Sequence, residues 1–149
     1  MQFGESILAL QVRPNDLDVL GHVNNAVVLE YLEAGRWDWL AGQGITRGGG
    51  VTAVVARAEV DYRGEIPFGP IEVRTVLESP SAEELAEGEA GYRAVFRQRI
   101  RRADAAGSTV DEDSAVKASW AVEALITVAC IDVERRCLVP LDEFLSASV

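Results

Sequence analysis

The sequence predicts an α+β fold in which one long helix packs against an antiparallel sheet. Two observations indicate this class. One stretch near the amino-terminal end has the periodicity of a long helix, and the segments after it alternate apolar and polar residues, as strands do. Strands that follow one another without intervening helices favour an antiparallel sheet over a parallel βαβ repeat. With 149 residues and no Pro- or Ser-rich linker, the chain is expected to form a single domain over residues 1–149.

The first strand is expected over Ile7–Val12, and the long helix is expected to follow from Asn24 to about Leu40. The segment GQGITRGGG then ends the helix, because glycine is unfavourable inside a helix and common in turns. The apolar side of this helix is expected to contain Val27, Val28, Tyr31, Leu32, Gly35 and Trp39. Glu30, Glu33 and Arg36 are expected on another side.

Four further strands are expected after the helix. The second of them spans IEVRTVL (71–77) and the third YRAVFRQRIRR (92–102), with polar or acidic connections at 78–91 and 102–114. A single helix covers only part of a sheet with this many apolar residues. A homodimer or homotetramer that covers the rest is therefore expected. Alternation with a period of two puts Val54, Ala56, Ala58, Val60 and Tyr62 on one face of the first of these strands, and Val116, Ala118, Trp120, Val122, Ala124, Ile126 and Val128 on one face of the last.

Composition excludes several functions. The net charge of −10 argues against nonspecific nucleic-acid binding and against docking on anionic lipid. Two cysteines and one histidine cannot build a zinc site alone, and no metal or other cofactor is expected. No signal peptide is recognised at the start, and Glu123 interrupts the longest apolar run, so no membrane span is expected. These features are typical of a cytoplasmic enzyme with reduced thiols.

A polar cluster lies directly before the helix, in the segment RPNDLDVLGHVNN. The first amides of a helix are unpaired donors that can stabilise negative charge on a carbonyl oxygen. A carboxylate one turn earlier, such as Asp18, can act as a general base or as a nucleophile. Gly21 permits a tight backbone approach. The alternative is structural: Asp16 and Asp18 form Asx turns, and Asn24 or Asn25 caps the helix.

The segment NDLDVLGHVNNAVVLEYLEAGR resembles the Asp-x-Asp-x-x-Gly-His-Val-Asn-Asn signature and following helix of the hotdog-fold acyl-CoA thioesterases, in their 4-hydroxybenzoyl-CoA thioesterase-like branch. The segments ARAEVDYRGEIPFGPIEVRTVL and IDVERRCLVPL are similar to later parts of the same family, so the resemblance covers most of the chain. It implies a five- or six-stranded antiparallel sheet wrapped around one long helix. It also implies dimers, often tetramers, with active sites at the subunit boundary.

The resemblance implies hydrolysis of an acyl thioester of coenzyme A or of an acyl carrier protein, without a cofactor. By position, Asp18 is the catalytic carboxylate and the helix start near Asn25 supplies the N–H for the substrate carbonyl. These groups are expected to converge on one cavity large enough for an acyl group. His22 either orients water or the thioester, or bonds a backbone carbonyl in a buried turn. The remaining candidate substrate-binding residues are Gly21, Val23, Asn24, Val28, Tyr62, Arg97 and Arg99.

The arginines of the strand at 92–102 allow two interpretations. Arg97, Arg99 and Arg101 share one face of that strand. They could clamp the phosphates of coenzyme A, because guanidinium groups match phosphate oxygens. They could instead form a solvated face or ion pairs with the acidic loops. Two other functions also stay open: a hotdog-type enoyl-CoA hydratase or dehydratase, and a non-catalytic protein that binds acyl thioesters.

Overall fold

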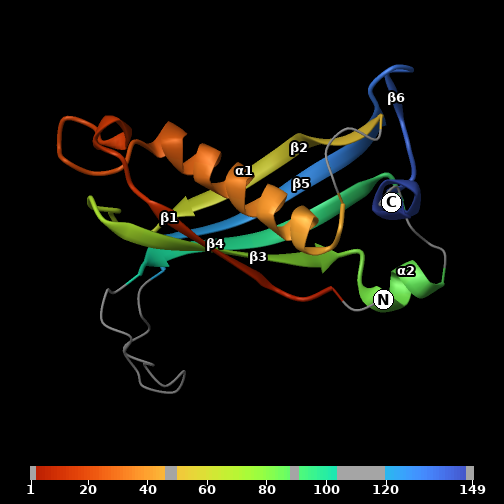
Figure 1. Cartoon of the computed structure of the whole chain (residues 1–149), viewed down its shortest axis with the longest axis horizontal. Coiled ribbons are helices and arrows are strands. Elements are labelled where there is room, and N and C mark those ends of the chain that lie inside the picture. The colour runs from red at the N-terminus through yellow and green to blue at the C-terminus, as the bar shows by residue number, and fades with distance from the viewer. Residues whose placement is uncertain (1–2, 46–49, 88–90, 104–119, 147–149) are drawn as a thin grey trace.

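The fold is a curled six-stranded sheet with one long helix against its inner face (Figure 1). The computed structural model describes residues 3–45, 50–87, 91–103 and 120–146. The elements are β1 (Ser6–Gln11), a 3-10 turn at Pro14–Asp16, α1 (Asn25–Gly42), β2 (Val51–Tyr62), β3 (Pro70–Ser79), α2 (Ala82–Ala86), β4 (Arg93–Arg102), β5 (Val122–Asp132), β6 (Cys137–Leu138) and α3 (Leu141–Ser146).

All strand pairs are antiparallel, as predicted. The strands lie in the order β1-β3-β4-β5-β2, and the short β6 pairs with β5. The α+β class and the six-stranded sheet are therefore confirmed. The strands β1 and β2 lie at the two ends of this order, so within the described residues each pairs with a single neighbouring strand.

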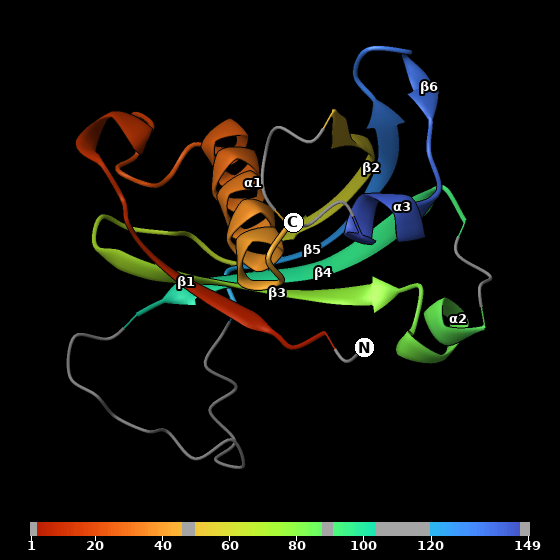
Figure 2. The ribbon, with the colours of Figure 1, turned by 45° about the vertical axis from the view of Figure 1, so that its right-hand side comes forward.

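Helix α1 packs on one part of the sheet and leaves another part open. Its closest approach is at Gly35, where an added Cβ atom would lie 2.7 Å from Val73 and 2.9 Å from Thr75. Buried apolar side chains between Val28 and Leu40, among them the fully buried Trp39, fix the helix over β1, β3 and β4. Figure 2 shows α1 crossing this part of the sheet, with β2 and β5 extending beyond it.

The helix starts after one of the two asparagines that the sequence predicts as its N-cap. Asn24 precedes the helix as its N-cap, and its side-chain oxygen accepts a hydrogen bond from the Ala26 amide at 2.9 Å. This bond satisfies one of the donors that a helix start leaves unpaired. The predicted helix is confirmed, with its end shifted from about Leu40 to Gly42.

Two expectations about the strands need correction. Trp120 does not share a face with Val122, because β5 begins only at Val122 and the indole lies against arginines on the outer face of the sheet. The face predicted for β2 is interrupted by a bulge between Val55 and Arg57, and a bulge reverses the alternation. The acidic connection contains α2, and the closing segment contains β6 and leads into α3. The expectations for 104–119 lie outside the described residues.

Candidate functional site

The segment between β1 and α1 forms a tight turn that presents Asp18. The Asp18 amide donates to the His22 carbonyl at 2.7 Å, and the Gly21 amide donates to the Asp18 carbonyl at 3.1 Å. Gly21 has a φ of +81°, in the left-handed region where a side chain would be strained. The Asp18 Oδ1 atom accepts hydrogen bonds from the Leu20 and His22 amides at 2.9 and 3.2 Å. The expectation that Asp18 forms an Asx turn therefore holds for its Oδ1 atom.

The other oxygen of Asp18 is in a different position. Asp18 is exposed, and its Oδ2 atom accepts no hydrogen bond from any residue that the structure describes. One oxygen of the carboxylate thus fixes its orientation, while the second stays available to a ligand or to water. A base or a nucleophile needs such an oxygen.

The first amide of α1 is also available. The Ala26, Val27 and Val28 amides all donate to Asn24, through its side chain or its carbonyl. The Asn25 amide makes no hydrogen bond within the described part of the chain. It lies at the positive end of the helix dipole, where an anionic oxygen is stabilised. The hydroxyl of Tyr62, from the end of β2, donates to the Asn25 carbonyl at 3.1 Å and links the edge strand to this helix start.

His22 faces a carboxylate that the sequence did not single out. Its Nε2 atom lies 3.0 Å from the Oε2 atom of Glu65, in the connection between β2 and β3. His22 is half-buried, whereas Glu65 is exposed. The histidine therefore contacts a side chain of a neighbouring loop, and its backbone closes the Asp18 turn.

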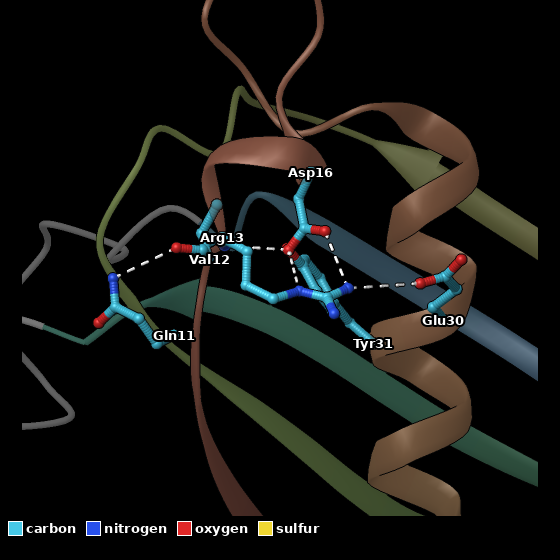
Figure 3. A network of polar contacts seen from close by, with 6 residues as sticks. All are labelled: Gln11, Val12, Arg13, Asp16, Glu30 and Tyr31. Carbon is cyan, nitrogen blue, oxygen red and sulfur yellow. Dashed lines mark hydrogen bonds and ion pairs between the residues drawn. The ribbon is translucent and has the colours of Figure 1, made fainter.

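An ionic network centred on the buried Asp16 anchors the same segment (Figure 3). Asp16 is 3% exposed, and its Oδ2 atom accepts from the Arg13 amide at 3.0 Å and from the Tyr31 hydroxyl at 2.7 Å. The Arg13 guanidinium lies 3.0 Å from Oδ1, and this pairing, followed by the Tyr31 hydrogen bond, holds the pKa of Asp16 at about 2. Asp16 also accepts from the Asn24 amide through its carbonyl, at 2.8 Å. This network fixes the segment from Arg13 to the helix cap.

A groove of about 470 Å³ runs between α1 and the open part of the sheet. Its walls and floor are mainly apolar, and Arg36, Glu30 and Glu33 contribute its charged groups. The apolar residues include Leu29, Trp37 and Leu40 of α1, Val54 and Val55 of β2, and Phe96, Ile126 and Val128 on the strands below.

The groove does not bring Asp18 and the helix start together, so their expected convergence on one cavity stays a prediction. Within the described residues, the groove lining begins at Leu29, one turn into α1, and includes neither Asp18 nor Asn25. The physical reason is the shape of the segment: the turn at Asp18 projects into solvent beyond the edge of the helix, with Leu20 exposed at its tip. A closed cavity at Asp18 would need a wall from outside this chain.

Other predicted substrate-binding residues lie elsewhere. Val23 and Val28 are in the hydrophobic core, where they pack under the helix start. Arg97 pairs with Glu78, and the Arg99 guanidinium lies 4.2 Å from the centroid of the Trp120 ring. Both arginines are on the face of β4 opposite to its buried residues, so they face away from α1 and the groove. In the single chain this agrees with the interpretation as a solvated, ion-paired face.

The predicted position of Arg36 is wrong. The sequence puts it with Glu30 and Glu33 on a side away from the apolar one, yet Arg36 is 9% exposed and adjoins the buried Gly35. Its spacing gives the signal, because Arg36 follows Leu32 by four residues and precedes Trp39 and Leu40 by three and four. The prediction for Arg36 is wrong because it follows the charge of the residue and not its spacing.

The comparisons with known proteins agree with this architecture. A family model described as the thioesterase-like superfamily matches residues 12–149. The long-chain acyl-CoA thioesterase FadM of Escherichia coli is 31% identical over 137 residues, which cover 89% of this chain and 88% of that protein. A hypothetical protein from Thermus thermophilus is 27% identical, with 98% of each chain covered and a TM-score of 0.70. A 1,4-dihydroxy-2-naphthoyl-CoA thioesterase from Synechocystis is 18% identical, covers 97% and 95%, and has a TM-score of 0.71.

These findings confirm the predicted hotdog fold and thioester hydrolysis as the activity class. No described helix has the length and apolar character needed to cross a membrane. Among the described residues, no three His, Cys, Asp or Glu side chains are grouped so as to hold a metal ion. The family match spans nearly the whole chain and agrees with both the sheet order and the motif before α1, and the chain therefore belongs to the thioesterase-like superfamily.

Proposed function

We propose that this protein hydrolyses acyl thioesters of coenzyme A to the free acid and the thiol, with Asp18 as its catalytic carboxylate. One observation carries the proposal. Asp18 is held by two backbone amides through one oxygen, and its second oxygen is free on the turn that leads into α1, whose first amide, at Asn25, is also free. A base or nucleophile and an oxyanion donor are the two groups that thioester hydrolysis needs.

The chemistry follows from these two groups. Either the Asp18 Oδ2 atom takes a proton from water while the water oxygen attacks the thioester carbon, or it attacks that carbon itself and water then hydrolyses the mixed anhydride. In both routes the carbon–sulfur bond breaks and the sulfur leaves with the electron pair. The Asn25 amide donates to the carbonyl oxygen as negative charge develops on it. His22, which is paired with Glu65, lies on the same turn and can hold the attacking water.

Acyl-CoA is the favoured substrate class for two reasons. FadM, which shares 31% identity with this chain, is a long-chain acyl-CoA thioesterase. The groove beside α1 is mainly apolar and begins one turn from the helix start, so an acyl chain bound there would have its thioester close to Asn25. An acyl carrier protein as the donor is less favoured, since such carriers are acidic and this chain has a net charge of −10.

A homodimer or homotetramer would complete the site. The edge strand β2 has a free side along its length, with exposed Val54 and Val55, and Leu29 of α1 is exposed beside it. A second copy that covers these residues would bury apolar surface and supply the wall that Asp18 lacks in one chain. The cytoplasmic location expected from the sequence remains a prediction.

The test is Asp18→Asn, measured as release of free thiol from short, long and aromatic acyl-CoAs. Asparagine keeps an oxygen for the Leu20 and His22 amides, so the turn is retained while the base is lost. We expect kcat to fall by roughly 10² to 10⁴ with little change in thermal stability. The matched control is Asp142→Asn, in the exposed first turn of α3, which removes the same charge. Unchanged thiol release in Asp18→Asn would contradict the assigned role.

A further inference from the structure

Arg36 is a buried charge at the centre of the groove wall. It lies in the middle of α1, it is 9% exposed, and its side chain lines the groove. Within the described residues its guanidinium makes one hydrogen bond, from Nη1 to the Oε1 atom of Gln98 at 3.0 Å. An amide is a neutral partner, and no carboxylate of the described chain lies within ion-pair distance. A buried cation without an anion is costly.

The residues behind Arg36 hold it in one orientation. The Gln98 amide nitrogen donates to the Leu32 carbonyl at 2.8 Å and to the Thr75 hydroxyl at 2.9 Å. These two bonds fix the Gln98 side chain so that its oxygen faces Arg36. Gly35 lets the helix approach closely enough for this, since an added Cβ would lie 3.0 Å from the Gln98 nitrogen. The Nη1 atom of Arg36 thus donates to Gln98 on the side of the sheet, and the remaining donors of the guanidinium are left for the groove.

We propose that the groove selects acyl chains that carry an oxygen function, a carboxylate or a hydroxyl, near the end remote from the thioester, and that Arg36 binds that oxygen. The proposal rests on the thioesterase function proposed above and adds the substrate class. A site built to hydrogen-bond a substrate oxygen rejects the analogue that lacks it, because the buried donors then stay unpaired. A purely apolar groove would favour a plain hydrocarbon chain instead.

The position of Arg36 along the helix sets the length of the chain. Eleven residues separate Asn25 from Arg36, which is roughly 16 Å along the axis at 1.5 Å per residue. Helical side chains lean toward the amino-terminal end, so the guanidinium lies somewhat closer, at roughly 10 to 16 Å from the helix start. An extended acyl chain of medium length spans this distance, and dodecanoyl derivatives are therefore suitable probes.

Glu33 provides a way to separate the two oxygen chemistries. Burial lowers the pKa of Arg36, and the nearby carboxylate of Glu33 acts in the opposite direction. Glu33 is exposed on the rim of the groove, so its charge repels a carboxylate substrate more than a hydroxyl. Glu33→Gln is expected to raise the ratio of kcat/KM for dodecanedioyl-CoA to kcat/KM for ω-hydroxydodecanoyl-CoA.

The main experiment compares dodecanoyl-CoA, ω-hydroxydodecanoyl-CoA and dodecanedioyl-CoA as substrates of the full chain. For at least one oxygenated substrate, kcat/KM is expected to exceed that of dodecanoyl-CoA by about tenfold or more. In Arg36→Met this ratio should fall to about one. The matched control is Arg135→Met, an exposed arginine in the turn after β5, which loses the same charge and should keep the ratio. If Arg36→Met does not fold, Arg36→Gln serves as the second variant.

Two results would overturn the proposal while leaving the thioesterase function intact. The first is a wild-type preference for dodecanoyl-CoA over both oxygenated chains. The second is a ratio that Arg36→Met or Arg36→Gln leaves unchanged. If that unchanged ratio comes with a smaller assembly in light scattering, Arg36 pairs with a carboxylate of a second copy. Failure of the thioesterase proposal has a different signature, because the wild-type protein would then release no thiol from any of the three substrates.

Discussion

Replacing Asp16 tests whether the buried network holds the segment that carries Asp18. In Asp16→Asn, one side-chain oxygen becomes an NH₂ group. All the groups around the Asp16 side chain are donors, namely the Arg13 amide and guanidinium and the Tyr31 hydroxyl, so the new NH₂ group faces donors and finds no acceptor. Burial is the main cause that raises the pKa of Tyr31, and its hydrogen bond to Asp16 is the second. The phenol therefore stays protonated and donates to Asp16.

The magnitude follows from the pKa of Asp16. The Arg13 pairing is the main cause that holds this pKa at about 2, below its ordinary value of 3.8. A pKa lower by about 1.8 corresponds to about 2.4 kcal/mol of preference for the charged form, at roughly 1.4 kcal/mol per pKa unit. The Arg13 side chain is 69% exposed, so solvent screens the pair. We therefore expect Asp16→Asn to lower the free energy of unfolding by about 1 to 2 kcal/mol at neutral pH.

The same reasoning gives the pH dependence. Because the folded pKa of Asp16 is lower than the unfolded one, its stabilising effect is present above about pH 4 and is lost as the pH falls toward 2. Urea unfolding followed by tryptophan fluorescence should show a difference between wild type and Asp16→Asn that shrinks over this range. Asp61→Asn, at an exposed position of β2, is the control and should change stability by less than about 0.5 kcal/mol. A difference that stays constant from neutral pH down to about pH 2.5 would refute the reasoning.

Two further predictions concern the core. Gly35→Ala is expected to destabilise the protein by about 1 kcal/mol in urea unfolding, because crowding against Val73 and Thr75 outweighs the gain in helix propensity; a more stable variant would contradict the close packing. Cys137 is exposed, whereas Cys130 is buried and burial raises its pKa to about 11. A thiol reagent should therefore modify Cys137 alone in the folded protein and both cysteines in urea, and equal rates in the folded protein would be inconsistent with this packing.

The parts of the fold that the sequence predicted are those with strong local signals. The alternation in β3, β4 and most of β5 holds because these strands have neighbours on both sides and one buried face. The signal fails for β2 because an edge strand with a bulge has no continuous buried face. It fails for Trp120 because the register of β5 is set by pairing that begins at Val122, after the tryptophan. Non-local pairing decides both cases.

The candidate site was predictable in its motif and less so in its surroundings. Asp18, Gly21 and the helix cap are local in sequence, so their turn could be predicted from residue types. The positions of Glu65 and Arg36 depend on contacts between residues that are far apart in the sequence. His22 contacts Glu65 in the β2–β3 connection, and Arg36 contacts Gln98 on β4. The spacing within α1 places residue 36 with the apolar side chains, but no pattern within α1 shows that a strand places an amide below it. The charge of Arg36 therefore predicts a surface position although the fold buries it.

Asp16 and Asp18 show why residue type alone does not fix a role. They are two residues apart and chemically identical, and both belong to the same motif. Asp16 points inward, where Arg13 and Tyr31 occupy both of its oxygens, so its carboxylate has little capacity to accept a proton at neutral pH. Asp18 points outward and bonds through one oxygen only. The first aspartate can stabilise the segment because it is fully bonded, whereas the catalytic role proposed for the second needs the oxygen that its turn leaves free. The proposed role of Asp18 requires the Asp16 network to fix the backbone, since a free carboxylate on a loose turn would have no fixed position relative to the start of α1.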